Sequence, residues 1–121
     1  VIDLTRLSDS TGRVIWSFGV DSSNRVSCFI ANNDRVFLRL RVGGSNLVDI
    51  STGALAATGE TQIDFQVKNG AFTLSATGVA DAVPNTGTFS LPALSTAYVG
   101  LDFSGAYLHG AMKYLSLRSV G

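Results

Sequence analysis

The sequence predicts an all-β fold, an antiparallel two-sheet sandwich of the jelly-roll type. Three observations predict it. Apolar and polar residues alternate with a period of two in several segments, and no segment has the period of a helix. Turn-forming residues recur at intervals of about ten positions, as in sandwiches of short strands. The 121 residues suffice for one domain with a sizeable core.

The clearest alternation lies in residues 35–42 and separates two kinds of side chain. The apolar face consists of Val36, Leu38, Leu40 and Val42, and the opposite face of Arg35, Phe37, Arg39 and Arg41. One face therefore belongs to the core. The arginine-bearing face has three interpretations: a solvated sheet face, a subunit interface in which Phe37 packs, or a surface that binds an acidic polysaccharide.

Further strands are expected at 13–20, 26–30, 47–50, 63–67, 72–76 and 88–91, with a loop at 52–60. In the first of them, Val14, Trp16, Phe18 and Val20 share one face, so Trp16 is expected in the core rather than as a sugar-stacking platform. The dipeptide at 69–70, Asn-Gly, predicts a hairpin with a type I′ turn.

The last quarter of the chain predicts the closing strands of the sandwich. Residues 98–103 alternate, with Val99 on the core side, and the following segment reads Leu108-His109-Gly110-Ala111-Met112-Lys113-Tyr114-Leu115-Ser116-Leu117. A bulge near Lys113 and Tyr114 would bring both Met112 and Leu115 to the core.

The pattern Leu-x-Gly-x-Met-x-x-Leu-x-Leu at 108–117 resembles the closing strand of concanavalin A-like and laminin G-like jelly rolls. The chain looks most like the small sandwich modules at the ends of bacteriophage tail fibres and tailspikes. The resemblance spans residues 12–121 and implies a homotrimeric virion module that binds glycans on a bacterial surface, stabilises the trimer, or caps the shaft.

Domain boundaries follow from the same pattern. Residues 12–121 are expected to form the sandwich domain, and residues 1–11 a linker or an edge strand from a preceding region. Because the chain begins at Val1 without a methionine, we expect a processed product or a fragment of a longer polypeptide.

Composition restricts the partners. Nine basic and nine acidic residues balance, so no global field favours nucleic acid. No apolar run approaches the ~18 residues of a membrane helix, so membrane insertion is not expected. Charged residues are 15% of the chain, below the ~25% of an average domain, which favours a homo-oligomer with an apolar interface. Cys28, the single cysteine, excludes an internal disulfide and is expected in the core.

No residue pattern predicts catalysis, so no catalytic residue is assigned. Glycosidases need two carboxylates flanking the scissile bond, but Glu60 is the single glutamate and its nearest acidic neighbour is Asp64. The single histidine, His109, is not accompanied by the Gly-x-Ser-x-Gly motif that holds the nucleophilic serine of many hydrolases. No metal site or cofactor is expected, because the acidic residues lack a recognisable ligand spacing.

Candidate ligand-binding residues lie in loops. Tyr107 and His109 share the loop at 104–110, and Asp102, Asn33 and Asp34 lie in or near turns. Each also has a structural interpretation, as a turn former or a loop residue bonded to backbone.

Three functions follow. The first is the non-enzymatic phage-tail module, located in the virion and otherwise extracellular. The second is a lectin or laminin G-like adhesion domain of cellular origin. The third is a structural virion spacer without a ligand.

Overall fold

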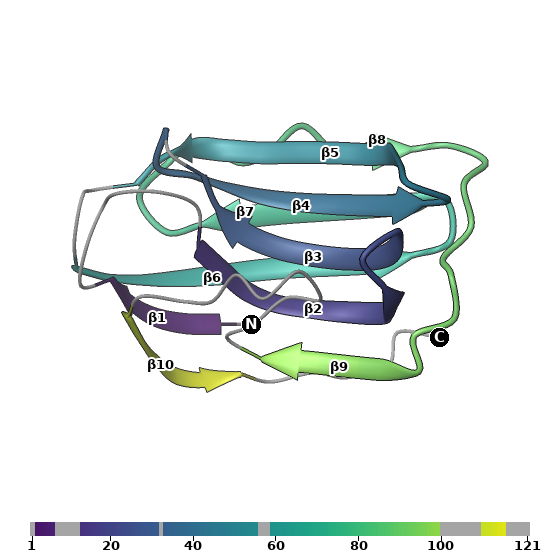
Figure 1. Ribbon diagram of the computed structural model, residues 1–121. Helices are drawn as coiled ribbons and strands as arrows, with labels where there is room; N and C mark the ends of the chain where they lie inside the picture. Colours follow the sequence, from purple (N-terminus) through teal and green to yellow (C-terminus); the bar gives the residue numbers. More distant parts are fainter. Residues whose placement is uncertain (1, 7–12, 32, 56–58, 100–109, 116–121) are drawn as a thin grey trace.

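The computed structural model describes residues 2–6, 13–31, 33–55, 59–99 and 110–115 (Figure 1). These residues form ten strands and no helix, packed as two antiparallel sheets. The predicted fold class, an all-β two-sheet sandwich, is confirmed.

Each sheet contains five of the described strands. The sheet nearer the viewer in Figure 1, here the front sheet, has the order β5 (Ser45–Ala54), β4 (Arg35–Val42), β3 (Asn24–Ile30), β2 (Arg13–Asp21) and β9 (Thr96–Val99). The back sheet has the order β10 (Gly110–Leu115), β1 (Ile2–Arg6), β6 (Gly59–Lys68), β7 (Ala71–Ala76) and β8 (Asn85–Thr86).

The core lies between the inner faces of the two sheets. On β4 the alternation behaves as predicted, because Val36, Leu38 and Leu40 are fully buried. Trp16 is also fully buried, as expected for a core residue. Its ring centroid lies 4.6 Å from that of Phe18 on the same strand and 4.7 Å from that of Phe65 on the back sheet. The Trp16–Phe65 contact therefore joins the two layers.

One bulge corrects the expected pattern of β2. Its register with β3 shifts between Val14 and Trp16, so Val14 pairs with Phe29 and Trp16 with Cys28. Val14 therefore shares the outer face with Phe29, where it is nevertheless buried, while Ile15 and Trp16 both join the core between the sheets. An inserted residue reverses the facing of everything beyond it, which simple alternation cannot reveal.

Two residues expected in the core are exposed: Val20 is 49% exposed and Val99 is 54% exposed. Val20 is the residue that the β2–β3 ladder passes over, because the register shifts between Gly19 and Asp21. Val99 is on β9, an edge strand of the front sheet as described, where a side chain has neighbours on one side only.

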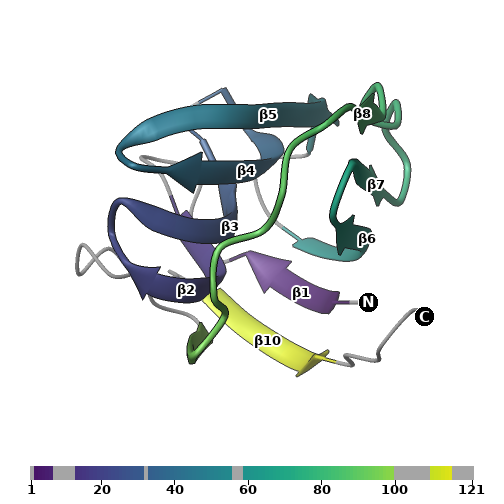
Figure 2. The same cartoon turned by 90° about the vertical axis from the view of Figure 1, so that its right-hand side faces the viewer.

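Residues 87–95 run across one end of the sandwich from the back sheet toward β9 (Figure 2). Asn69 and Gly70, in the β6–β7 turn, hold this segment: the Leu91 N–H donates to Asn69 Oδ1 over 2.8 Å, and the Gly70 N–H to the Phe89 carbonyl over 3.0 Å. The predicted hairpin is present, but the predicted type I′ turn is wrong. A type I′ turn needs a positive φ at both central residues; Gly70 has a φ of 79°, whereas the φ of Asn69 is not positive.

Other bounds also differ from the predictions. β5 continues to Ala54 and β6 begins at Gly59, so the connection is shorter than the predicted loop at 52–60. Residues 88–91 form no strand. Residues 2–6 form β1, which lies between β6 and β10 and is therefore an interior strand rather than an edge strand. The domain boundary at residue 12 stays a prediction.

The predicted bulge near Lys113 is confirmed at the level of backbone register. Leu4 pairs with Met112 and Asp3 with Tyr114, so the ladder passes over Lys113. In the described ranges, no helix has the length and apolar character needed to cross a membrane.

Replacing Gly19 with alanine should destabilise the fold. An alanine Cβ at this position would collide with the Asn24 carbonyl oxygen and lie 2.7 Å from Arg25 Cα, because the β2–β3 hairpin closes directly beside it. We expect Gly19→Ala to lower the free energy of unfolding by about 2 kcal/mol or more. In the control Gly87→Ala, the Cβ would make an ordinary 3.6 Å contact with the Phe89 ring. Urea denaturation should show a change below about 0.5 kcal/mol for this control; equal effects of the two changes would refute the close approach.

Cys28 should make stability depend on alkaline pH. The side chain is fully buried, and desolvation raises the pKa of its thiol well above the usual range. Above about pH 8.5 the unfolded state loses the thiol proton and the folded state keeps it. The free energy of unfolding should then fall by up to about 1.4 kcal/mol per pH unit relative to Cys28→Ala. Identical pH slopes for the two proteins, measured by denaturation between neutral and alkaline pH, would contradict the burial of the thiol.

Candidate functional site

Strand register organises the outer face of the front sheet into three rows, since directly paired residues of antiparallel strands lie on the same face. The central row crosses all five described strands and consists of Tyr98, Ser17, Ser27, Arg39 and Asp49, of which Ser17 and Ser27 are buried. The row on one side of it consists of Thr96, Gly19, Arg25, Arg41 and Asn46. The row on the other side consists of Val14, Phe29, Phe37 and Ser51.

The middle of this surface combines arginines with aromatic rings. We call the set Arg25, Arg39, Arg41, Phe29 and Phe37 the arginine face. The rings of Phe29 and Phe37 are stacked, with centroids 5.3 Å apart and an interplanar angle of 6°. Arg39 Cζ lies 4.8 Å from the centroid of Phe29. The ring quadrupole attracts the guanidinium at this distance, so Phe29 helps to fix the position of Arg39.

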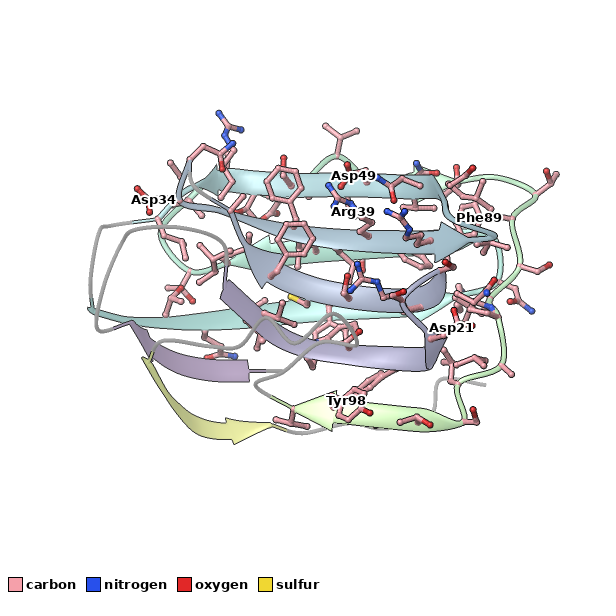
Figure 3. The ribbon with its side chains drawn as sticks, in the orientation of Figure 1. Asp21, Asp34, Arg39, Asp49, Phe89 and Tyr98 are labelled. Atoms are coloured by element: carbon pink, nitrogen blue, oxygen red, sulfur yellow. The ribbon has the colours of Figure 1, made fainter. Side chains whose placement is uncertain are left out.

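A carboxylate fixes Arg39 from the other side. Arg39 Nη2 donates to Asp49 Oδ2 over 3.0 Å and Arg39 Nε to Asp49 Oδ1 over 3.3 Å, a two-point contact that sets the plane of the guanidinium. Figure 3 shows Arg39 and Asp49 beside each other on β4 and β5, toward the viewer. The contact joins adjacent strands.

Among the residues of the three rows, arginines outnumber acidic residues. Arg25 and Arg41 pair directly across β3 and β4, and the three rows contain three arginines against one aspartate. Arg41 Nε is buried and has no hydrogen-bond partner in the described part of the chain. The protein as a whole is neutral, so the charge of these three rows differs from that of the complete chain. Guanidinium groups match planar carboxylates and phosphates with paired hydrogen bonds.

Of the four residues that the sequence places on the outer face of β4, three lie on this surface: Phe37, Arg39 and Arg41. Arg35 lies at the start of β4, where Arg35 Nη1 donates to the Thr52 carbonyl over 3.3 Å. Whether these residues form a subunit interface is untested and stays a prediction.

Sequence reasoning missed Arg25 and Phe29, although a signal was present. They alternate with the buried Val26, Cys28 and Ile30 on β3, so they belong to the opposite face of that strand. Their position beside Arg41 and Phe37 depends on the β3–β4 register, which the alternation alone does not reveal.

Of the predicted ligand-binding residues, Asn33 and Asp34 lie in the β3–β4 turn. Asn33 Oδ1 accepts from the Arg35 N–H over 3.1 Å, and Asp34 has a positive φ of 64°. The Leu55 N–H donates to the Asp34 carbonyl over 2.8 Å. Both residues therefore shape the turn. Asp102, Tyr107 and His109 lie outside the described residues, so a shared site remains a prediction.

The described residues contain no group of three or more His, Cys, Asp or Glu side chains placed to hold a metal ion. The thiol of Cys28 is enclosed in the core, where its raised pKa keeps it protonated and unreactive.

Comparison with solved structures identifies similar folds. The chain is similar to the CBM40 module of a Ruminococcus gnavus IT-sialidase, with a TM-score of 0.70 and 15% identity over 92% of this chain and 68% of that one. Structures of that module bound to α2,3-sialyllactose and to α2,6-sialyllactose have TM-scores of 0.69 and 0.66, at 16% and 13% identity. They cover 92% and 90% of this chain, and 68% and 67% of theirs.

The likeness to these modules shows a shared β-sandwich fold. No protein-family model matches the sequence, and no curated protein matches it.

The Arg39–Asp49 contact should orient the guanidinium without adding much stability. The two side chains are 27% and 37% exposed, and exposed ion pairs contribute little after solvent screening. A double-mutant cycle with Arg39→Gln and Asp49→Asn should give a coupling below about 1 kcal/mol, shrinking as salt is added. A coupling of several kcal/mol, insensitive to salt, would show instead that the pair is a structural element of the sheet.

Proposed function

We propose that this protein is a non-catalytic carbohydrate-binding domain whose arginine face binds glycans that carry a carboxylate. The observation that carries the proposal is the placement of three arginines and two stacked phenylalanines on one sheet face. Support comes from the fold, which is shared with sialidase modules whose solved structures hold sialyllactose. Sialyllactose ends in an acidic sugar, the chemistry that guanidinium groups recognise.

Each part of the arginine face has a task in this proposal. Arg39 is oriented by Asp49 and Phe29 and offers its remaining N–H groups to the sugar carboxylate. Arg41 is half-buried, so a hydrogen bond from it is less exposed to competition by water. Phe37 and Phe29 offer apolar surface against which the C–H groups of a pyranose ring can pack.

The similar structures favour the lectin-like function predicted from the sequence over the phage-tail module. They are modules of a sialidase, and nothing in the comparisons points to a virion. Location in a phage tail, trimer formation and a spacer role therefore stay predictions. We also propose that the domain works outside the cell, since that is where surface glycans are bound.

Binding of 3′-sialyllactose, measured by isothermal titration calorimetry, tests the proposed function, with lactose as the matched ligand that lacks the acidic sugar. We expect sialyllactose to bind and lactose to bind at least about tenfold more weakly, since a charged hydrogen bond contributes about 1.5–3 kcal/mol. Arg39→Gln and Arg41→Gln should each weaken sialyllactose binding by about tenfold or more. Added salt should weaken it as well, because screening reduces the attraction between exposed charges.

Lys68→Gln is the control variant, because it removes one positive charge from an exposed position of the back sheet. Its affinity for sialyllactose should match that of the unmodified protein. Equal binding of lactose and sialyllactose, or full binding by a correctly folded Arg39→Gln, Arg41→Gln double variant, would refute the proposal.

A further inference from the structure

The outer face of the back sheet contains a hollow of about 280 Å³ that is open to solvent. Polar and apolar residues contribute to its described lining in similar measure, and three separate segments supply them. The polar side chains are Asp64 and Gln66 on β6, Thr73 and Ser75 on β7, and Asp81 in the segment that follows β7; the apolar residues are Phe65, Leu74, Ala82 and Pro84.

Strand register builds the floor of this hollow. Asp64 pairs with Ser75 and Gln66 with Thr73, so the four side chains form two adjacent rows on one face. The residues between them, Phe65 on β6 and Leu74 on β7, pack into the core on the other side of the sheet. The polar floor is therefore a fixed property of the β6–β7 ladder.

The wall that carries Asp81 is anchored to both sheets. The Ala82 N–H donates to the Leu74 carbonyl of β7 over 3.1 Å, and Ala82 is only 4% exposed. The Gly53 N–H of β5 donates to the Ala80 carbonyl over 2.9 Å. Asp81 lies between these two attachment points, so its backbone is held in place before any ligand arrives. A prearranged group costs less ordering entropy on binding than a mobile one.

The chemistry of the hollow is opposite to that of the arginine face. Asp64 and Asp81 are acceptors when ionised, while the hydroxyls of Thr73 and Ser75 and the amide of Gln66 both donate and accept. No lysine or arginine is among the described lining residues, so an anion would meet repulsion there. The volume is close to the lower end of the ~300–1,000 Å³ of ligand pockets, which suits one small ring.

We propose that this hollow is a second glycan site, which binds one uncharged sugar residue through its hydroxyl groups. The carboxylates of Asp64 and Asp81 would accept hydrogen bonds from neighbouring hydroxyls of the ring, and Thr73 and Ser75 would complete the network. The site lies on the opposite sheet from the arginine face, so the domain could hold two parts of a branched glycan, or two glycans, at once. This inference goes beyond the proposed function and does not depend on acidic-sugar binding.

Nuclear magnetic resonance titration of the ¹⁵N-labelled protein tests the second site. The probes are the methyl glycosides of glucose, galactose, mannose and N-acetylglucosamine, each added separately. We expect at least one of them to cause saturable shifts, with a Kd in the millimolar range, at amides of β6, β7 and residues 79–84. The Asp64→Asn, Asp81→Asn double variant should weaken this binding by about tenfold or more, and Thr73→Val should weaken it without changing the fold.

Gln62→Ala is the matched control, since its exposed side chain lies on β6 but does not line the hollow. Its affinity for the same glycoside should be unchanged. The hollow variants should keep their affinity for 3′-sialyllactose, and Arg39→Gln should keep its affinity for the glycoside, so failure of one site is distinguishable from failure of the other. Absence of saturable shifts with all four glycosides, shifts confined to other strands, or a response to calcium alone would overturn the second site.

Discussion

The register between β3 and β4 is the constraint on which the rest of this structure depends. Val26, Cys28 and Ile30 face the same core as Val36, Leu38 and Leu40, and all six are 2% exposed or less. A slip of one residue would exchange the faces and carry arginines into the core, where an unpaired charge is very costly. The burial of these small apolar side chains therefore determines where the charged residues of both strands lie.

This constraint also explains an arrangement that is unfavourable by itself. Arg25 and Arg41 lie directly opposite each other, and like charges in such a pair destabilise a sheet by up to about 1 kcal/mol. A core with this many buried residues can sustain such a loss. Both guanidinium groups lie on the sheet face that we propose as the binding site for the sugar carboxylate.

The sequence predicted those features that depend on local periodicity. The core stripe of β4, the buried Trp16, the hairpin at Gly70 and the backbone bulge at Lys113 could all be inferred from neighbouring residues. The position of Val14 on the outer face could not be inferred, because the bulge beside it depends on the register between β2 and β3. The same limit applies to both surfaces: Phe29 meets Phe37 across two strands, and Asp64 and Asp81 meet at one hollow through the path of the chain after β7. Period-two patterns state which face a residue occupies and not which residue lies beside it.

The two sheets thus present opposite chemistry, an arginine and phenylalanine surface in front and an acid and hydroxyl hollow behind. The central claim is that the front surface holds the acidic sugar, and a crystal structure of the protein with 3′-sialyllactose tests it most directly. The account predicts the sugar carboxylate within hydrogen-bond distance of Arg39 or Arg41, with a ring of the ligand against Phe37. A sialyllactose molecule bound elsewhere, with the arginine face in contact only with water, would contradict it.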